Sequence, residues 1–208
     1  MNNHGQIIYI VDDDASVCKA LKLLLEQHGF KVETFPCAAD FLSFKHPKVP
    51  SCLVSDIRMP GISGLALQET MALQQVNVPI VFITGHGNIP MSVKAVQAGA
   101  IDFLPKPFTE KKLLNAIERA IAKNKIQNKQ QAEINKIKQH IKTLSPRELE
   151  VFRLVALGML NKQIASKRGN ALQTIKVHRG RVMQKMQAKT VTELIHFAQK
   201  AGITSSLD

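Results

Sequence analysis

Cysteine is scarce in this 208-residue chain, and its spacing matches neither a disulfide framework nor a metal site. The three cysteines are Cys18, Cys37 and Cys52, an odd number without a CxxC pair. Structural disulfides and zinc centres are therefore disfavoured, and a reducing compartment is favoured.

Long apolar runs are also missing. No uninterrupted stretch reaches the roughly 20 residues that a membrane-spanning helix needs. The first residues lack a basic segment followed by an apolar one, so no secretory leader is indicated. We therefore expect a soluble, cytoplasmic protein with no membrane partner.

Acidic residues are few in the last third of the chain. Residues 143–208 carry 11 Lys and Arg against four Asp and Glu, whereas residues 1–123 carry 12 against 11 and residues 124–142 carry five against one. A chain of this length that is 45% apolar suits two small domains. The uneven charge points to nucleic acid as the partner of the second half, with an anionic membrane as the weaker alternative.

The first 122 residues alternate short apolar runs with helical patterns. This alternation indicates parallel β-α units whose sheet is covered on both faces. The expected strands are residues 7–11, 32–35, 52–56, 79–83 and 101–105. The pattern therefore predicts an α/β domain with a five-stranded parallel sheet.

Polar residues stand at or just past the ends of four of these strands. They are Asp12, Asp13, Asp56, Thr84 and Lys106. Ligands of such sheets bind beyond the carboxyl ends of the strands, where the strand order reverses, so we expect the five side chains to converge. Three carboxylates, a hydroxyl and an ammonium group would form a site for a divalent cation and a phosphoryl group.

Glycine and proline are both absent between Pro107 and Pro146. The apolar spacing of a core helix thins after residue 121 to a sparse isoleucine seam among Lys, Gln and Asn. The stretch is either one helix from about Thr109 to Ile141, roughly 50 Å long, or a frayed linker. Helix propensity favours the helix. We place a domain at 1–122, a helical linker at 123–142 and a second domain at 143–208.

The last 66 residues are all-α by pattern. Residues 145–148 and 190–193 read as capping boxes at the starts of two helices. A short helix from Asn161 and a longer one over about 172–187 are joined by a turn that contains glycine. Such a pair in a basic four-helix unit describes a helix-turn-helix.

Several spaced motifs in both halves of the chain resemble those of known protein families. VDD at 11–13, SDIRMPG at 55–61, ITG at 83–85 and LPKP at 104–107 resemble the receiver domain of two-component response regulators. LSPRE at 144–148, NKQIA at 161–165 and TIKVHR at 174–179 resemble the LuxR-type helix-turn-helix. Together they resemble the FixJ/NarL class. The resemblance implies a doubly wound, flavodoxin-like receiver joined by a long helical linker to a four-helix DNA-binding domain.

The acidic cluster calls for a cation, because three carboxylates in one pocket repel one another. Mg²⁺ suits because it takes oxygen ligands and keeps several waters. We assign to it Asp12, Asp13, Asp56 and the backbone carbonyl of Arg58. The resemblance makes Asp56 the nucleophile that forms an acyl phosphate, with Lys106 and Thr84 at the phosphoryl oxygens. It also implies a cis Lys106–Pro107 peptide bond.

The resemblance implies a switch at the same site. Thr84 would move toward the phosphoryl group, and Phe103 would turn inward. The alternative is that Phe103 is simply a core aromatic residue. Arg58 and His86, each two residues past a site residue, are hypothesised to tune the lifetime of the acyl phosphate.

An enzyme is the remote alternative. Haloacid-dehalogenase-like phosphatases also use an aspartate nucleophile with Mg²⁺, but they carry a second acid two residues later. Here that position is Arg58, which cannot act as a general acid or base, and no cap domain is present. We therefore expect no enzymatic activity.

The expected DNA reader is the helix over about 172–187. Lys176 can reach guanine acceptors, Val177 a thymine methyl group, and Gly180 permits close approach in the major groove. The phosphate-contact candidates are Lys162, Thr174, Arg179, Arg181 and Lys185. A domain that docks another protein is the alternative.

The turn before this helix departs from the family pattern. It has Asn170 and Ala171 where an aliphatic and a small hydroxyl residue are usual. Ala caps a helix less well than Ser by about 1 kcal/mol, so Asn170 is expected to take over the cap one residue early. We expect looser packing of the two helices and a greater dependence on dimerisation.

Dimers are expected because paired half-sites on DNA mirror two-fold protein symmetry. The candidate contacts are Val191, Leu194, Ile195 and Ala198, although Leu194 and Ile195 fit a core role equally well. The switch face of the receiver offers a second dimer surface.

The expected partners are a sensor histidine kinase, double-stranded promoter DNA, RNA polymerase and a second copy of the chain. The main interpretation is a phosphorylation-controlled transcription regulator. The alternative keeps the fold but makes DNA binding independent of phosphorylation.

Overall fold

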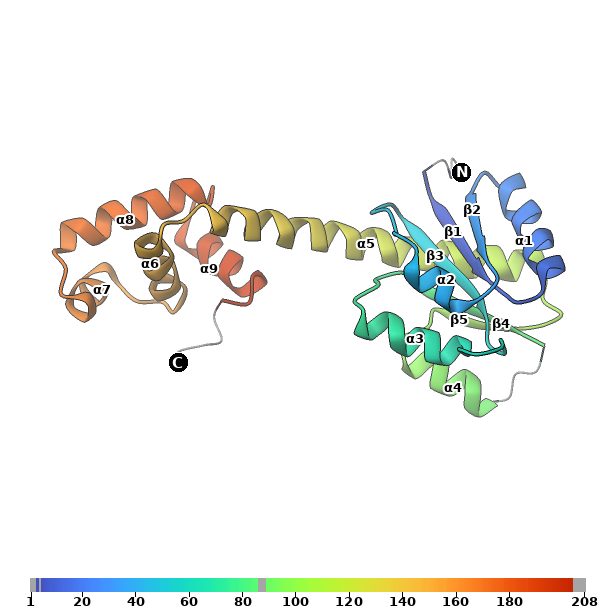
Figure 1. Ribbon diagram of the computed structural model, residues 1–208. Coiled ribbons are helices and arrows are strands. Elements are labelled where there is room, and N and C mark those ends of the chain that lie inside the picture. Colours follow the sequence, from blue (N-terminus) through green and yellow to red (C-terminus); the bar gives the residue numbers. More distant parts are fainter. Residues whose placement is uncertain (1–2, 4, 86–88, 204–208) are drawn as a thin grey trace. The chain divides into compact units, whose positions relative to one another are not determined.

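A computed structural model describes residues 3, 5–85 and 89–203 (Figure 1). The chain divides into two compact units, Met1–Lys129 and Gln130–Asp208. In the described ranges no helix combines the length and apolar character needed to cross a membrane.

The first unit is built on a five-stranded parallel sheet in the order β2-β1-β3-β4-β5. The strands are β1 (Ile7–Val11), β2 (Lys31–Phe35), β3 (Ser51–Asp56), β4 (Ile80–Thr84) and β5 (Asp102–Pro105). After β1 the chain forms β2 at one edge of the sheet and then returns to form β3 on the other side of β1. The strand order therefore reverses between β1 and β3, which brings the residues after these two strands together.

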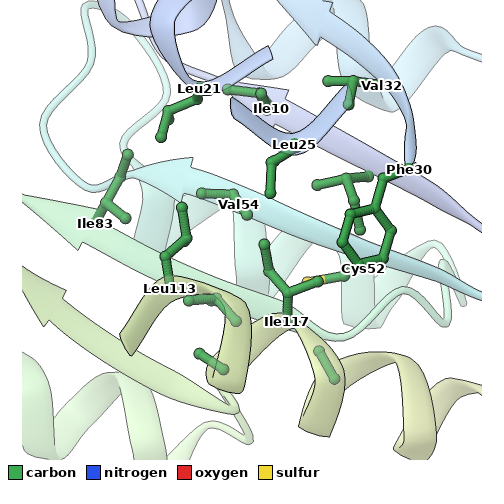
Figure 2. Close-up of a cluster of buried hydrophobic side chains, with 14 of the residues drawn as sticks. Ile10, Leu21, Leu25, Phe30, Val32, Cys52, Val54, Ile83, Leu113 and Ile117 are labelled. Carbon is green, nitrogen blue, oxygen red and sulfur yellow. The ribbon is translucent and has the colours of Figure 1, made fainter. Parts of the chain in front are cut away.

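Helices cover both faces of this sheet, as the near-continuous burial of β1, β3 and β4 requires. They are α1 (Ala15–Gln27), α2 (Ala38–Ser43), α3 (Gly64–Leu73), α4 (Ile89–Gln97) and the first part of α5 (Glu110–Lys142). Leu21 and Leu25 of α1 and Leu113 and Ile117 of α5 pack on one face (Figure 2). On the other face, α2, α3 and α4 cover a second cluster around Tyr9, Phe41 and Phe82.

Helix α5 is continuous from Glu110 to Lys142, so the helical alternative for this stretch is confirmed. Its first part stays attached to the sheet beyond residue 122. The buried Asn124 side chain accepts the Ser51 N–H at 2.9 Å and donates to the Asn77 carbonyl at 2.7 Å. Asn128, one turn later, donates to the Val49 carbonyl at 3.3 Å. These bonds fasten α5 to the starts of β3 and β4.

The second unit packs the end of α5 with α6 (Pro146–Ala156), α7 (Asn161–Arg168), α8 (Leu172–Lys185) and α9 (Val191–Lys200). Ile137 of α5 is buried in the same core as Phe152 and Val182. The predicted capping box at Ser145 and Glu148 is present, with both reciprocal hydrogen bonds. The predicted box at 190–193 is only half formed, because Thr190 accepts the Glu193 N–H but the Glu193 carboxylate accepts the Lys189 N–H instead.

The turn between α7 and α8 differs from one expectation. Gly169 adopts the left-handed conformation with φ of +62°, and Ala171 is the N-cap of α8, without a side-chain hydrogen bond. The expectation that Asn170 takes over the cap is therefore wrong. The Asn170 backbone N–H instead bonds to the Ala165 carbonyl at 3.0 Å, which closes the end of α7 and carries the chain one residue further before α8 begins.

Candidate functional site

Three of the predicted site residues meet at the carboxyl edge of the sheet. Lys106 Nζ lies 3.2 Å from Asp12 Oδ2 and 3.1 Å from Asp56 Oδ1. Asp12 follows β1, Asp56 ends β3 and Lys106 follows β5. The fold thus joins positions up to 94 residues apart in the sequence into one cluster.

Local backbone bonds orient both carboxylates. Asp12 Oδ1 accepts the Asp14 N–H at 2.9 Å, and Asp56 Oδ2 accepts the Arg58 N–H at 2.7 Å. Each side chain therefore uses one oxygen to hold its own loop and presents the other to Lys106. The Lys106–Pro107 peptide bond is cis, as the resemblance implied.

The two carboxylates are withdrawn from water. Asp12 is 3% exposed and Asp56 8%. Burial raises the pKa of Asp12, although the Asp14 N–H and Lys106 oppose the rise. Burial acts against the charge of Lys106 as well, but its bonds to Asp56 and Asp12 more than offset this and raise its pKa. Two carboxylates therefore face a single ammonium group in this cluster.

The remaining predicted residues lie around this cluster in different settings. Asp13 is exposed, and with Asp12 it lines a hollow of about 300 Å³ beside the first turns of α1. Thr84 is buried at the end of β4, and its carbonyl accepts the Lys106 N–H at 2.7 Å. Arg58 is exposed, and Phe103 is half-buried against the core under α3 and α4. His86 lies outside the described residues.

The donor set fits Mg²⁺. Within the part of the chain that the structure describes, no three His, Cys, Asp or Glu side chains form a ligand group. Mg²⁺ needs fewer, because it binds through one or two carboxylates and keeps several waters. Asp12 and Asp56 supply that pair, and the raised pKa of the buried Asp12 marks a place where additional positive charge is favourable.

Gly64 is a site residue that the sequence reasoning missed. A Cβ atom built on it would lie 2.4 Å from the Asp56 carbonyl oxygen, 2.9 Å from a Phe82 ring carbon and 3.0 Å from Ile57 Cα. Its N–H donates to the Ile57 carbonyl at 2.9 Å. Only glycine lets the first turn of α3 lie this close to the loop of Asp56. A glycine just before a predicted helix, after a strand-end aspartate, was the available signal.

In the second unit, glutamates neutralise some of the basic residues. Glu148 binds Lys185 at 2.6 Å, and Glu150 pairs with Arg168. Hydrogen bonds from Lys185 and from the Ser145 N–H lower the pKa of Glu148 to about 2. Lys185 also donates to the Thr143 carbonyl at 3.1 Å, so its ammonium group joins α8 to α6 and the end of α5. A structural role thus competes with the phosphate contact expected of Lys185.

The predicted reader face of α8 is accessible. Val177 is 45% exposed. Exposed positions also include Thr174, Lys176, Gly180 and Arg181 of α8 and Lys162 of α7. Arg179 is half-buried and donates from Nη1 to Asn161 Oδ1 at 2.7 Å. Within the described residues, Lys162, Lys176 and Arg181 have no ion pair or hydrogen bond to another side chain, so no acidic side chain offsets their charge.

Two of the four dimer candidates are wrong. Leu194 and Ala198 have no exposed surface and pack in the core of the second unit. The apolar stripe of α9 turns inward because the small unit needs these side chains to close its core. Val191 and Ile195 remain half-exposed.

Comparison with known proteins identifies both units. The response regulator receiver domain matches residues 8–118, and the luxR family of bacterial regulatory proteins matches residues 142–198. Nodulation protein W of Bradyrhizobium diazoefficiens is 42% identical over 200 residues, which cover 96% of this chain and 88% of that protein. Transcriptional regulatory protein FixJ of the same species is 41% identical over 196 residues, which cover 94% of this chain and 96% of FixJ.

A solved structure agrees over nearly the whole chain. The response regulator StyR is 45% identical and superposes with a TM-score of 0.78, covering 94% of this chain and 99% of StyR. The receiver match lies on the unit that holds the Asp12–Asp56–Lys106 cluster, and the luxR match lies on the basic helical unit. The chain therefore belongs to the two-component response regulators of transcription, which join a receiver domain to a LuxR-type helix-turn-helix domain.

Proposed function

We propose that Asp56 accepts a phosphoryl group from a partner histidine kinase and that the phosphorylated protein binds promoter DNA. The bridge that Lys106 makes between Asp12 and Asp56 carries this proposal. This bridge supports a site in which one oxygen of Asp56 faces both the Lys106 ammonium group and a position for a cation. Phosphoryl transfer depends mainly on such positioning and on neutralisation of charge.

The proposed transfer forms one bond to phosphorus and breaks another. Asp56 Oδ1, which faces Lys106, forms a bond to phosphorus while the bond between phosphorus and the nitrogen of the donor histidine breaks. Lys106 Nζ then pairs with a phosphoryl oxygen, and Thr84 donates its hydroxyl to another. Mg²⁺, when bound, neutralises part of the phosphoryl charge. Asp12, Asp56 and the Arg58 carbonyl would hold it, with Asp13 acting through water.

DNA recognition is assigned to α8. We propose that Lys176 and Val177 contact base edges and that Gly180 allows close approach to the groove. The phosphate contacts are then Lys162, Thr174, Arg179 and Arg181, which set the position on the duplex without reading its sequence. Lys162, Thr174 and Arg181 are exposed and Arg179 is half-buried. None of the three basic residues has an acidic partner in the described part of the chain, which supports this assignment.

Activation is proposed to act through association of two copies. Phe103, half-buried at the edge strand β5, would turn inward when Thr84 moves toward the phosphoryl group, which changes the receiver surface on which two copies meet. Val191 and Ile195 are the remaining dimer candidates in the second unit. A dimer on a two-fold-symmetric promoter site would then present the regulator to RNA polymerase.

The test uses Asp56→Asn, with Asp40→Asn on α2 as the matched control because Asp40 is also an aspartate but is exposed and is not one of the two carboxylates paired with Lys106. Each protein is incubated with a random-sequence duplex library, with and without beryllofluoride plus Mg²⁺, and the retained DNA is sequenced. We expect the wild type and Asp40→Asn to enrich a two-fold-symmetric site on activation and Asp56→Asn to fail.

Other outcomes would change the assignment. Equal enrichment with and without beryllofluoride would refute the switch and support DNA binding that is independent of phosphorylation. Steady hydrolysis of a phosphate ester by the purified protein would revive the phosphatase alternative. Enrichment of no site in any condition would refute the DNA reader.

A further inference from the structure

The first residue of α7 contacts a basic residue in the middle of α8. Asn161 Oδ1 accepts a hydrogen bond from Arg179 Nη1 at 2.7 Å, and both side chains are half-buried. We propose that Asn161 is a positioning residue for DNA binding, which fixes the guanidinium group of Arg179 for a contact with a DNA phosphate. This inference rests on the phosphate contact proposed above for Arg179.

The chemistry of the pair favours orientation over neutralisation. A guanidinium group has five N–H donors in a rigid plane, so one bond to Asn161 leaves four for a phosphate. Arg168 of α7 and Lys185 of α8 are instead paired with glutamates, which cancel their charge. In the described part of the chain Arg179 has no carboxylate partner, so its positive charge stays available to DNA.

The location of the pair fits the same role. Arg179 lies three residues after Lys176, which places both on one side of α8, next to the proposed base contacts. The turn before α8 lacks a side-chain capping bond at Ala171. The turn therefore does little to hold the start of α8, and the Asn161–Arg179 bond supplies a second link between α7 and α8. Holding Arg179 before DNA arrives reduces the side-chain entropy lost on binding.

The experiment is a double-mutant cycle on DNA binding with the activated full-length protein. The variants are Asn161→Ala, Arg179→Ala and their combination, and the probe is the duplex that the wild type enriches from a random library. Asn170→Ala is the matched control, since Asn170 is an exposed amide in the turn between α7 and α8 and makes no side-chain hydrogen bond within the described residues. The urea midpoint of each variant is measured in parallel.

We expect Asn161→Ala to weaken binding about fivefold, the scale of one lost hydrogen bond. In the Arg179→Ala background it should have almost no further effect, and Asn170→Ala should bind like the wild type. Asn161→Asp gives a second test. An aspartate at the start of α7 would hold Arg179 by an ion pair and suit the helix N-terminus, so the urea midpoint should be kept while DNA binding falls.

Results opposite to these would show which of two proposals fails, the positioning role of Asn161 or the phosphate contact of Arg179. If Asn161→Ala weakens the Arg179→Ala protein by the same factor as the wild type, Asn161 does not act through Arg179. If Asn161→Asp binds DNA as well as the wild type, the bond is only a structural link between α7 and α8. Either outcome overturns the inference and leaves DNA binding intact. An unchanged affinity in Arg179→Ala, or a wild type that selects no duplex, overturns the phosphate contact and the inference with it.

Discussion

Replacing Lys106 with Met should make the stability of the receiver depend on added cations and on low pH. Lys106 Nζ lies 3.2 Å from Asp12 Oδ2 and 3.1 Å from Asp56 Oδ1, and both aspartates are buried. Met keeps the length of the side chain but removes the ammonium group. The variant therefore leaves two carboxylates close together without the cation that separates them.

The size of the effect follows from this geometry. Removing one partner of a buried ion pair costs about 3–5 kcal/mol. The Lys106 side chain is 29% exposed, and the carboxylates can take up a proton, so we expect about 2–3 kcal/mol at pH 7 without Mg²⁺. Mg²⁺ at 100 times its Kd stabilises a folded state by about 2.7 kcal/mol. Because Lys106 no longer competes for the carboxylates, Mg²⁺ should restore most of the loss.

The pH dependence has a definite sign. Burial raises the pKa of Asp12 in the folded protein, and Lys106 opposes that rise. A carboxyl group whose pKa is higher in the folded state stabilises the fold at low pH, and this contribution is lost as the pH rises through the folded-state pKa. Without Lys106 the pKa rises further. The deficit of Lys106→Met relative to the wild type should therefore shrink as the pH falls from 7 toward the ordinary carboxyl range.

Urea unfolding followed by tyrosine fluorescence measures this effect in the receiver alone. The chain has no Trp, and its single tyrosine, Tyr9, is fully buried in β1. Lys111→Met, at an exposed position of α5, is the control and should unfold like the wild type in all conditions. A Lys106→Met protein as stable as the wild type at pH 7 without Mg²⁺ would refute the reasoning.

Four further predictions concern Gly64, Gly180, Asn124 and Glu148. Gly64→Ala should lower the free energy of unfolding of the receiver by about 1–3 kcal/mol in the Tyr9 fluorescence assay, because its Cβ meets backbone atoms. Gly180→Ala meets nothing within 4 Å and should stabilise α8 by up to about 1 kcal/mol. Asn124→Ala leaves the buried Ser51 N–H unpaired and should cost about 1–3 kcal/mol by the same fluorescence assay. Glu148 has a pKa lowered to about 2, so the second unit should lose stability as the pH falls from about 4.5 toward 2. Glu148→Gln should show less of that acid loss by circular dichroism at 222 nm.

The sequence alone determined the architecture and the receiver cluster. Short buried strands alternate with amphipathic helices, and this order permits a parallel sheet with both faces covered. The carboxyl ends of parallel strands lie at one edge, so residues after β1, β3 and β5 had to meet there. Asp12, Asp56 and Lys106 were therefore expected at one edge of the sheet before any distance was known. The capping box at Ser145 and Glu148 was equally readable, because its bonds are local.

Tertiary structure alone decided which side chains are engaged within the protein. Asn124 reads as a surface residue of a polar helix, yet it is buried against the starts of β3 and β4. Leu194 fits both a dimer contact and a core residue in sequence, and packing assigned it to the core. Lys185 and Arg179 look alike as basic residues of one helix, but one binds a glutamate and the other an asparagine. Periodicity fixes the side of a helix on which a residue lies. The partner across the interface depends on residues distant in the chain, which no local pattern records.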